Sequence, residues 1–225
     1  MNFKTYLEAT GKKSVELAKI CESISLEKSI TVVVAPQFSD IKQVSESAHL
    51  PVFSQHVDPI EPGAHTGHVL AEALKSSGAT GTLINHSERR MRISEIEEAI
   101  EFARGSDLLT LVCANSSGVG AATASLNPDM IAIEPPELIG SGVAVSKARP
   151  ELVTKSVRRI RGVNAQVMVL VGAGVTNPED VSRAIELGSQ GVLVSSSVVK
   201  SKEPRTILAQ MADAALASSD STAQN

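Results

Sequence analysis

The sequence predicts an α/β fold in which short parallel strands alternate with helices, as in a (β/α)8 barrel. Apolar runs recur roughly every 25 residues along the chain, and an amphipathic segment follows each of them. The runs are continuous rather than alternating, which indicates strands buried on both faces of a parallel sheet. Hydrophobic residues make up 42% of the 225 residues, enough to build a sizeable core. An open doubly wound sheet would show the same alternation and remains an alternative at this point.

The elements follow one another from end to end. Strands are predicted over residues 30–35, 52–55, 80–84, 108–113, 130–133, 166–171 and 191–194. Helices are predicted over residues 14–25, 40–48, 68–77, 94–103, 150–161, 178–187 and 204–216. Ser94 and Glu97 have the spacing of a capping box, and Asn177 precedes Pro178 as an N-cap precedes a first-turn proline. Gly188 follows the next-to-last helix as a C′ glycine does.

The first strand of such a barrel has few residues to form it. If the barrel closes, strand one includes Asn2, Phe3 and Lys4, and only Met1 precedes them. We therefore expect a strand one that is truncated at the N-terminus, and a natural protein that starts a few residues earlier. No linker or change of composition divides the chain, so residues 1–217 are predicted to form a single domain and the polar residues 218–225 a disordered tail.

The composition excludes several classes of function. Aromatic residues are 2% of the chain and Trp is absent, so there is no stacking platform for single-stranded nucleic acid. The net charge is −4, which argues against binding to nucleic acid or an anionic membrane. Cys21 and Cys113 lack metal-ligand spacing, and Cys113 follows an apolar run as a small buried residue would. With no signal peptide or long apolar stretch, we expect a soluble cytoplasmic protein.

Glu134 is the most informative candidate for chemistry. It ends the apolar run of residues 131–133, and two prolines follow it at once. Those prolines prevent the strand from continuing, so the carboxylate stands at a strand's carboxyl end, where α/β folds place their active sites. The structural alternative is a salt bridge to Arg89 or Arg90.

His86 ends a second apolar run in the same way. The segment after it, residues 87–90, is interpreted as the start of a short helix, whose backbone N–H groups would disfavour an imidazolium. A structural histidine bonded to backbone is the alternative. The other histidines, His49, His56, His65 and His68, lack metal-ligand spacing and are predicted to lie in loops or on the surface.

Small residues follow the last two predicted strands. Gly172, Ala173 and Gly174 come after one strand, and Ser195 and Ser196 come after the next. In a barrel these are the loops after strands seven and eight, where backbone N–H groups bind phosphate. Tight strand-to-helix turns without a ligand would look the same. Lys4, judged by its neighbours alone, is a solvated lysine near a flexible terminus.

Taken together, these segments resemble the triosephosphate isomerase family, in particular its shorter archaeal form. The matching segments are Asn2-Phe3-Lys4, residues 63–67, Asn85-His86-Ser87-Glu88-Arg89-Arg90, residues 133–142, residues 171–175 and the end of strand eight. The His-Ser-Glu-Arg-Arg and Glu-Pro-Pro-Glu-Leu-Ile-Gly segments are specific. Ser195-Ser196 departs from the paired glycines that are common in the family.

The resemblance implies a (β/α)8 TIM barrel that interconverts dihydroxyacetone phosphate and glyceraldehyde 3-phosphate through an enediolate. It implies that Glu134 is the catalytic base, that neutral His86 polarises the substrate carbonyls, and that Lys4 stabilises the enediolate. Further implied roles are a hydrogen bond from Asn2, support of Lys4 by Glu88, and phosphate binding. The residues implied for phosphate binding are Gly140 in a lid over residues 135–145, Gly172, Ala173, Gly174, Ser195 and Ser196. No metal or organic cofactor is implied.

The resemblance also implies a homo-oligomer, with a tetramer favoured and a dimer possible. Thr66, in the loop of residues 63–67, would cross into a neighbouring subunit. Two alternatives stay open. One is another phosphate-binding barrel enzyme of sugar or amino-acid biosynthesis. The other is a catalytically impaired barrel that binds phosphate or a protein partner, because of the short first strand.

Overall fold

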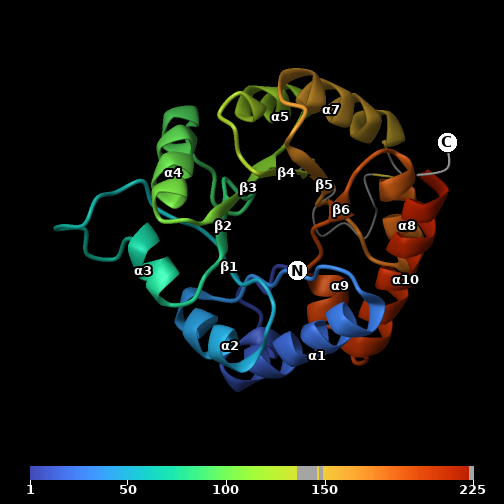
Figure 1. Cartoon of the computed structure of the whole chain (residues 1–225), viewed down its shortest axis with the longest axis horizontal. Helices are drawn as coiled ribbons and strands as arrows, with labels where there is room; N and C mark the ends of the chain where they lie inside the picture. Colours follow the sequence, from blue (N-terminus) through green and yellow to red (C-terminus); the bar gives the residue numbers. More distant parts are fainter. Residues whose placement is uncertain (136–145, 147–148, 223–225) are drawn as a thin grey trace.

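The computed structural model describes residues 1–135, 146 and 149–222. Its centre is one sheet of six parallel strands in the order β1-β2-β3-β4-β5-β6, so each strand pairs with the next one along the chain. The strands are β1 (Phe53–Ser54), β2 (Gly81–Ile84), β3 (Leu109–Ala114), β4 (Met130–Ile133), β5 (Met168–Val171) and β6 (Gly191–Val192). Figure 1 shows the strands curled around a central axis, with the helices outside them. The fold is therefore an α/β fold of the barrel type, and no open doubly wound sheet is present in the described part of the chain.

The helices alternate with the strands. They are η1 (Leu7–Ala9), α1 (Lys12–Lys28), η2 (Phe38–Asp40), α2 (Ile41–Ser47), α3 (Ala71–Ser76), α4 (Ile93–Gly105), α5 (Ser117–Ala124), α7 (Pro150–Val163), α8 (Pro178–Glu186), α9 (Ser196–Val199) and α10 (Pro204–Thr222). No helix in the described part of the chain is long and apolar enough to cross a membrane.

Two of the predicted helix signals are confirmed and one is wrong. The Asn177 side chain accepts a hydrogen bond from the Asp180 N–H at 3.0 Å, and Gly188 has a φ of 97° after α8. The predicted Ser94 cap is wrong because α4 begins at Ile93. The side chain of Glu95 reaches back to the Arg92 N–H at 2.7 Å, which satisfies one of the unpaired first-turn donors.

Two differences concern helices that the sequence did not predict in full. Helix α5 was missed because its glycines, Gly118 and Gly120, and its small residues give no amphipathic pattern. Gly120 fits there because a Cβ on it would lie 2.9 Å from the side chain of Ile160 in α7. Helix α10 continues to Thr222, so residues 218–222 extend a helix rather than form the predicted frayed tail.

The strand predicted over residues 30–35 forms only isolated bridges, Asn2 with Ala35 and Val34 with Val52. The N-terminal residues nevertheless bond on both sides. The Asn2 N–H donates to the Val194 carbonyl at 2.8 Å, and the Phe3 N–H donates to the Ala35 carbonyl at 3.0 Å. The N-terminal segment therefore lies between the chain after β6 and the chain before β1.

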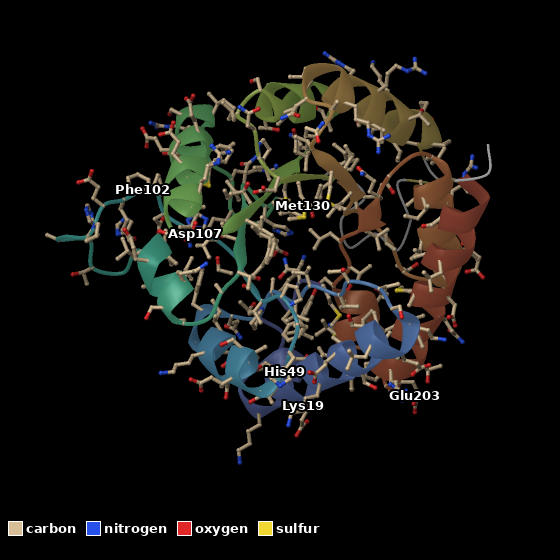
Figure 2. All side chains as sticks on the ribbon, viewed as in Figure 1. Lys19, His49, Phe102, Asp107, Met130 and Glu203 are labelled. Carbon is tan, nitrogen blue, oxygen red and sulfur yellow. The ribbon has the colours of Figure 1, made fainter. Side chains whose placement is uncertain are left out.

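The core has two layers that follow the alternation of side chains along the strands. The larger layer packs the outward residues of the strands, such as Ile131 and Ile133, against the helices. The smaller layer lies inside the ring and contains Ala35, Phe53, Leu83, Leu111, Cys113 and Ala132, with Met130 packed against it. Figure 2 shows Met130 within the ring, whereas Lys19 and Glu203 lie on the outer surface.

Candidate active site

Glu134 extends β4 by one residue and turns its side chain into the ring. Its N–H donates to the Ala114 carbonyl at 2.8 Å, which continues the ladder between β3 and β4. Only 1% of the residue is exposed. Oε1 lies 3.6 Å from Nε2 of His86, and Oε2 has no hydrogen-bond partner among the described residues. A buried carboxylate with a free oxygen is placed to accept a proton from a ligand.

Burial raises the pKa of Glu134 to about 7 because the charged form loses its water. A hydrogen bond with the Cys113 thiol and the positive charges of Lys4 and Arg90 act in the opposite direction, and the nearby Glu88 adds to the rise. A base with a pKa near neutrality can both take up and release a proton at neutral pH.

His86 follows β2, and the segment after it forms a turn rather than the predicted helix. The turn still disfavours the imidazolium, because it directs one backbone N–H at the His86 ring. The Glu88 N–H donates to Nδ1 of His86 at 3.2 Å, so in the neutral ring the proton is on Nε2, the nitrogen that faces Glu134. Burial lowers the pKa of His86 to about 4 against the attraction of Glu88, and Lys4 and Arg90 lower it further.

Lys4 is held in place rather than solvated. Its φ is 48°, and its N–H donates to Oδ1 of Asn2 at 2.9 Å. Its carbonyl accepts from Nε2 of Gln55 at 2.9 Å, and its Nζ bonds Oε1 of Glu88 at 2.7 Å. A left-handed backbone at a lysine costs energy and persists only where the surroundings fix it, as they often do at functional sites.

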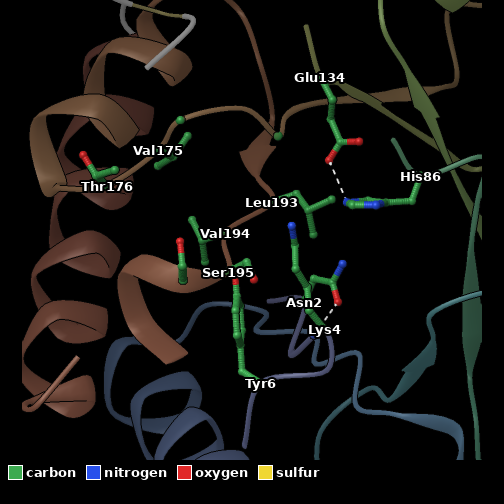
Figure 3. A pocket seen from close by; sticks show the side chains of 13 residues that line it. Asn2, Lys4, Tyr6, His86, Glu134, Val175, Thr176, Leu193, Val194 and Ser195 are labelled. Carbon is green, nitrogen blue, oxygen red and sulfur yellow. Dashed lines mark hydrogen bonds and ion pairs between the residues drawn. The ribbon is translucent and has the colours of Figure 1, made fainter. Parts of the chain in front are cut away.

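The three side chains face one cavity of about 180 Å³. Figure 3 shows Lys4 reaching up from the N-terminal segment toward the gap between Glu134 and His86. The lining residues are Asn2, Lys4, Tyr6, His86, Glu134, Gly172, Gly174, Val175, Thr176, Leu193, Val194, Ser195 and Ser196. Among the residues that the structure describes, no three His, Cys, Asp or Glu side chains converge as metal ligands would.

The predicted phosphate loops lie at one side of this cavity. Gly172, Gly174, Ser195 and Ser196 line it, whereas Ala173 is fully buried and does not. Ser195 precedes α9, and its buried Oγ has no hydrogen-bond partner among the described residues. Gly140 and the lid predicted over residues 135–145 lie outside the described residues, except for Pro135.

Thr66 does not line the cavity. Residues 61–68 are all exposed, and this loop projects from the ring between β1 and α3 in Figure 1. Its base is fixed by Asp58, which accepts from the Val69 N–H at 2.6 Å and pairs with His56 at 2.9 Å and Arg89 at 3.2 Å. His56, predicted to lie in a loop or on the surface, lies in the loop after β1, but it is buried there: it is 4% exposed and bonded to Asp58.

Sequence reasoning assigned no role to Tyr6 and Thr176, which line the cavity, or to Gln55 and Asn85, which hydrogen-bond Lys4 and the turn that carries His86. Tyr6 reaches the cavity because the chain turns at Lys4, whose φ is 48°, and no local sequence pattern indicates this. Asn85 directly precedes His86, and asparagine is among the few residues that tolerate a left-handed backbone.

Comparison with known proteins agrees with this geometry. The family model described as triosephosphate isomerase matches residues 1–214. The triosephosphate isomerase of Methanothermus fervidus is 47% identical over 211 residues, which cover 94% of this chain and 95% of that protein. That of Methanocaldococcus jannaschii is 51% identical, over 90% of this chain and 92% of that protein. These matches do not favour an impaired barrel or another phosphate-binding barrel, and the chain belongs to the triosephosphate isomerase family.

Proposed function

We propose that this cavity interconverts dihydroxyacetone phosphate and D-glyceraldehyde 3-phosphate, with Glu134 as the base. In the forward direction Glu134 removes a proton from C1 of the ketose. The electron pair of that C–H bond forms the C1–C2 double bond, and the π pair of the C2 carbonyl moves onto O2, which gives an enediolate. The same carboxylic acid then returns a proton to C2. A single carboxylate serves both steps, which fits a carboxyl whose pKa is about 7.

His86 supplies the electrophile in this proposal. Its neutral Nε2–H hydrogen-bonds the oxygen on which negative charge develops and delivers protons between O1 and O2 of the enediolate. A neutral imidazole suits this role because its pKa as an acid lies closer to the pKa of an enediol than the pKa of an imidazolium does. A glutamate base paired with a neutral histidine is the known arrangement of the triosephosphate isomerase family, so the roles follow the family and the geometry supports them.

Lys4 places a positive charge beside the same oxygens and is held there by Glu88. Its ammonium group stabilises the enediolate in a site that is poorly solvated, where electrostatic interactions are stronger than in water. Asn2 fixes the backbone of Lys4 through the bond from the Lys4 N–H at 2.9 Å.

The phosphate group occupies the side of the cavity formed by Gly172, Gly174, Ser195 and Ser196, with Gly140 in a lid over it. Ala173 contributes through its backbone only, since its side chain is buried in the core. The lid is required by the chemistry, because an enediolate phosphate exposed to water loses its phosphate by elimination. No metal or organic cofactor takes part.

The complete fold in this proposal is one (β/α)8 barrel over residues 1–217, with a truncated strand one. The hydrogen bonds of Asn2 to Val194 and of Phe3 to Ala35 support it, since they join the two ends of the sheet. The exposed loop of residues 61–68 supports a homotetramer or dimer in which Thr66 contacts a neighbouring subunit. Sedimentation that shows a stable monomer at micromolar concentration contradicts this assembly.

The observation that carries the proposal is the 3.6 Å approach of Glu134 to the neutral Nε2 of His86 inside the cavity. The test is a coupled assay with glyceraldehyde 3-phosphate on the wild-type chain and on Glu134→Asp. The shorter arm withdraws the base, so we expect kcat to fall by about 10² to 10³ while KM stays within a few-fold.

Glu186→Asp is the matched control, because Glu186 pairs with Arg183 on the surface at 3.1 Å. It is expected to keep the wild-type kcat. If Glu134→Asp turns over as fast as the control, Glu134 is not the base.

A further inference from the structure

Asn85 has the features of a residue that is held in place for a purpose. It has a φ of 61°, is 4% exposed, and directly precedes His86. Its side chain makes two hydrogen bonds: Nδ2 donates to the Cys113 carbonyl at 2.9 Å, and Oδ1 accepts from the Met91 N–H at 2.9 Å. These two bonds thus offset the backbone strain, and only an amide side chain can donate one and accept the other.

The bond from Nδ2 of Asn85 to the Cys113 carbonyl continues the contact between β2 and β3 beyond the last backbone pair. The last pair in the β2–β3 register is Ile84 with Val112, so Asn85 would face Cys113 next. The left-handed φ turns the Asn85 backbone out of the ladder, and its side-chain amide bonds the Cys113 carbonyl instead. This connects the base of the His86 turn to Cys113, which directly precedes the residue whose carbonyl accepts from the Glu134 N–H.

The second bond closes the turn that carries His86. The Met91 N–H reaches back across six residues to Oδ1 of Asn85, and the Arg89 N–H bonds the His86 carbonyl at 2.8 Å within the same turn. The turn is therefore fixed at both ends, and the Glu88 N–H is held where it meets Nδ1 of His86 at 3.2 Å.

We propose that Asn85 is a positioning residue for His86: its side chain clamps the turn of residues 85–91 to β3, so that Nε2–H of His86 faces Glu134 and the substrate oxygens. Asn85 does not line the cavity, so it acts through His86 and not on the substrate. The proposal rests on the proposed function of His86.

Asn85→Gly tests it, because glycine keeps the left-handed backbone without strain and removes both side-chain bonds. We expect kcat to fall by about 10- to 100-fold, since a displacement of the order of 1 Å costs that much, with KM within about threefold. The matched control is Asn127→Gly. Asn127 also has a positive φ, 56°, and its Oδ1 accepts from Asn164 on an exposed surface. We expect the control to keep the wild-type kcat.

A second readout distinguishes positioning from a general loss of structure. ¹⁵N NMR of the ligand-free protein reports the tautomer of His86. We expect the wild type and Asn127→Gly to show a single neutral form with the proton on Nε2, and Asn85→Gly to show a mixture of tautomers. If Asn85→Gly keeps both the wild-type kcat and the single tautomer, the proposal is overturned.

Two further outcomes are separable. If Asn85→Gly fails to fold, Asn85→Asp replaces it. Aspartate tolerates the left-handed backbone and can accept from the Met91 N–H, but it cannot donate to the Cys113 carbonyl. A wild-type kcat in this variant overturns the proposal. If the wild-type chain lacks isomerase activity, the proposed function fails, and the tautomer measurement still decides whether Asn85 orients His86.

Discussion

The arm of Glu134 lies directly over the backbone of Gly172. A Cβ built on Gly172 would lie 2.7 Å from Cγ of Glu134 and 2.8 Å from Oε1. Because real Cβ atoms do not approach so closely, no other residue fits at position 172 while the carboxylate keeps its place. Gly172, which the sequence indicated for phosphate binding, therefore also sets the position of the Glu134 carboxylate.

Gly172→Ala is expected to displace the carboxylate of Glu134 and lower kcat by about 10- to 100-fold, for the same geometric reason. Steady-state kinetics measures this. Gly162→Ala is the control, because a Cβ at this position in α7 meets nothing within 4 Å. The control should keep its activity and gain up to about 1 kcal/mol of stability from the better helix former. Equal kcat in both variants contradicts the role given to Gly172.

The pH dependence of activity should follow Glu134. The base works only when deprotonated and its pKa is about 7, so kcat/KM is expected to fall about tenfold per pH unit below pH 7. His86, with a pKa of about 4, stays neutral throughout this range. Phosphate monoesters titrate near pH 6 themselves. A ¹³C NMR titration of Glu134 in the ligand-free protein separates the titration of this carboxyl from that of the substrate phosphate. A midpoint below pH 5 excludes Glu134 as the cause of the fall in kcat/KM.

The same burial makes Glu134 a source of instability. Its folded pKa of about 7 is above the unfolded value of 4.5, so the folded state binds more protons and the free energy of unfolding falls as the pH rises through this window. We expect Glu134→Gln, which carries no charge, to be more stable than the wild type at pH 8 by up to about 3 kcal/mol.

At pH 4 the two proteins should unfold nearly alike, because Glu134 is then mostly protonated in both states. Urea denaturation at both pH values provides the comparison, with Glu186→Gln as a surface control. The quantity to compare is the gain in free energy of unfolding of Glu134→Gln over the wild type. If this gain is no larger at pH 8 than at pH 4, the buried charge of Glu134 does not destabilise the fold.

Glu88 should matter for catalysis although 59% of its side chain is exposed. Glu88→Gln removes the charge that holds Nζ of Lys4 at 2.7 Å but leaves the backbone N–H that bonds His86. With Lys4 less firmly held, we expect kcat/KM to fall roughly tenfold.

Glu27→Gln is the matched control for Glu88→Gln, since Glu27 also forms an ion pair at 2.7 Å, with Arg205, far from the cavity. An exposed pair of this kind is worth little, so its loss should leave both activity and stability nearly unchanged. If the two variants have the same kcat/KM, the Lys4–Glu88 contact has no catalytic importance.

Asp58→Asn should destabilise the base of the loop of residues 61–68. An asparagine at this position cannot accept from the Val69 N–H and bond Arg89 and His56 at the same time. At least one of these three donors therefore loses its acceptor, at a cost of about 1 to 3 kcal/mol. Thermal unfolding at pH 7 measures this, with Asp213→Asn, an exposed partner of Lys28, as the control.

The effect of Asp58→Asn has a defined pH dependence. Burial by itself raises the pKa of Asp58, but the hydrogen bonds from His56 and Val69 and the charge of Arg89 lower it overall. The carboxylate therefore stabilises the fold above its unfolded pKa of 3.8, and this contribution is lost as the pH falls through the lower folded value. A difference between wild type and variant that grows toward pH 3 contradicts this assignment.

The sequence by itself determined the alternation of strands and helices and the places of Glu134 and His86 at strand ends. These features are local: apolar runs, prolines, caps such as Asn177 and the glycine Gly188 act within a few residues. The family motifs supplied the roles that we propose for Glu134, His86 and Lys4. The predictions were wrong where the local sequence allows more than one cap or turn. Examples are the cap predicted at Ser94 and the helix predicted after His86.

Only the tertiary structure decided how these residues meet. Lys4 becomes a constrained part of the cavity because Gln55 and Glu88, far from it along the chain, bond it when the sheet curls. The pKa of Glu134 depends on how much water the packed ring excludes, which no local pattern contains. Asn85 and Gly172 take their importance from single close contacts across neighbouring strands, and such contacts exist only once the strands are in register.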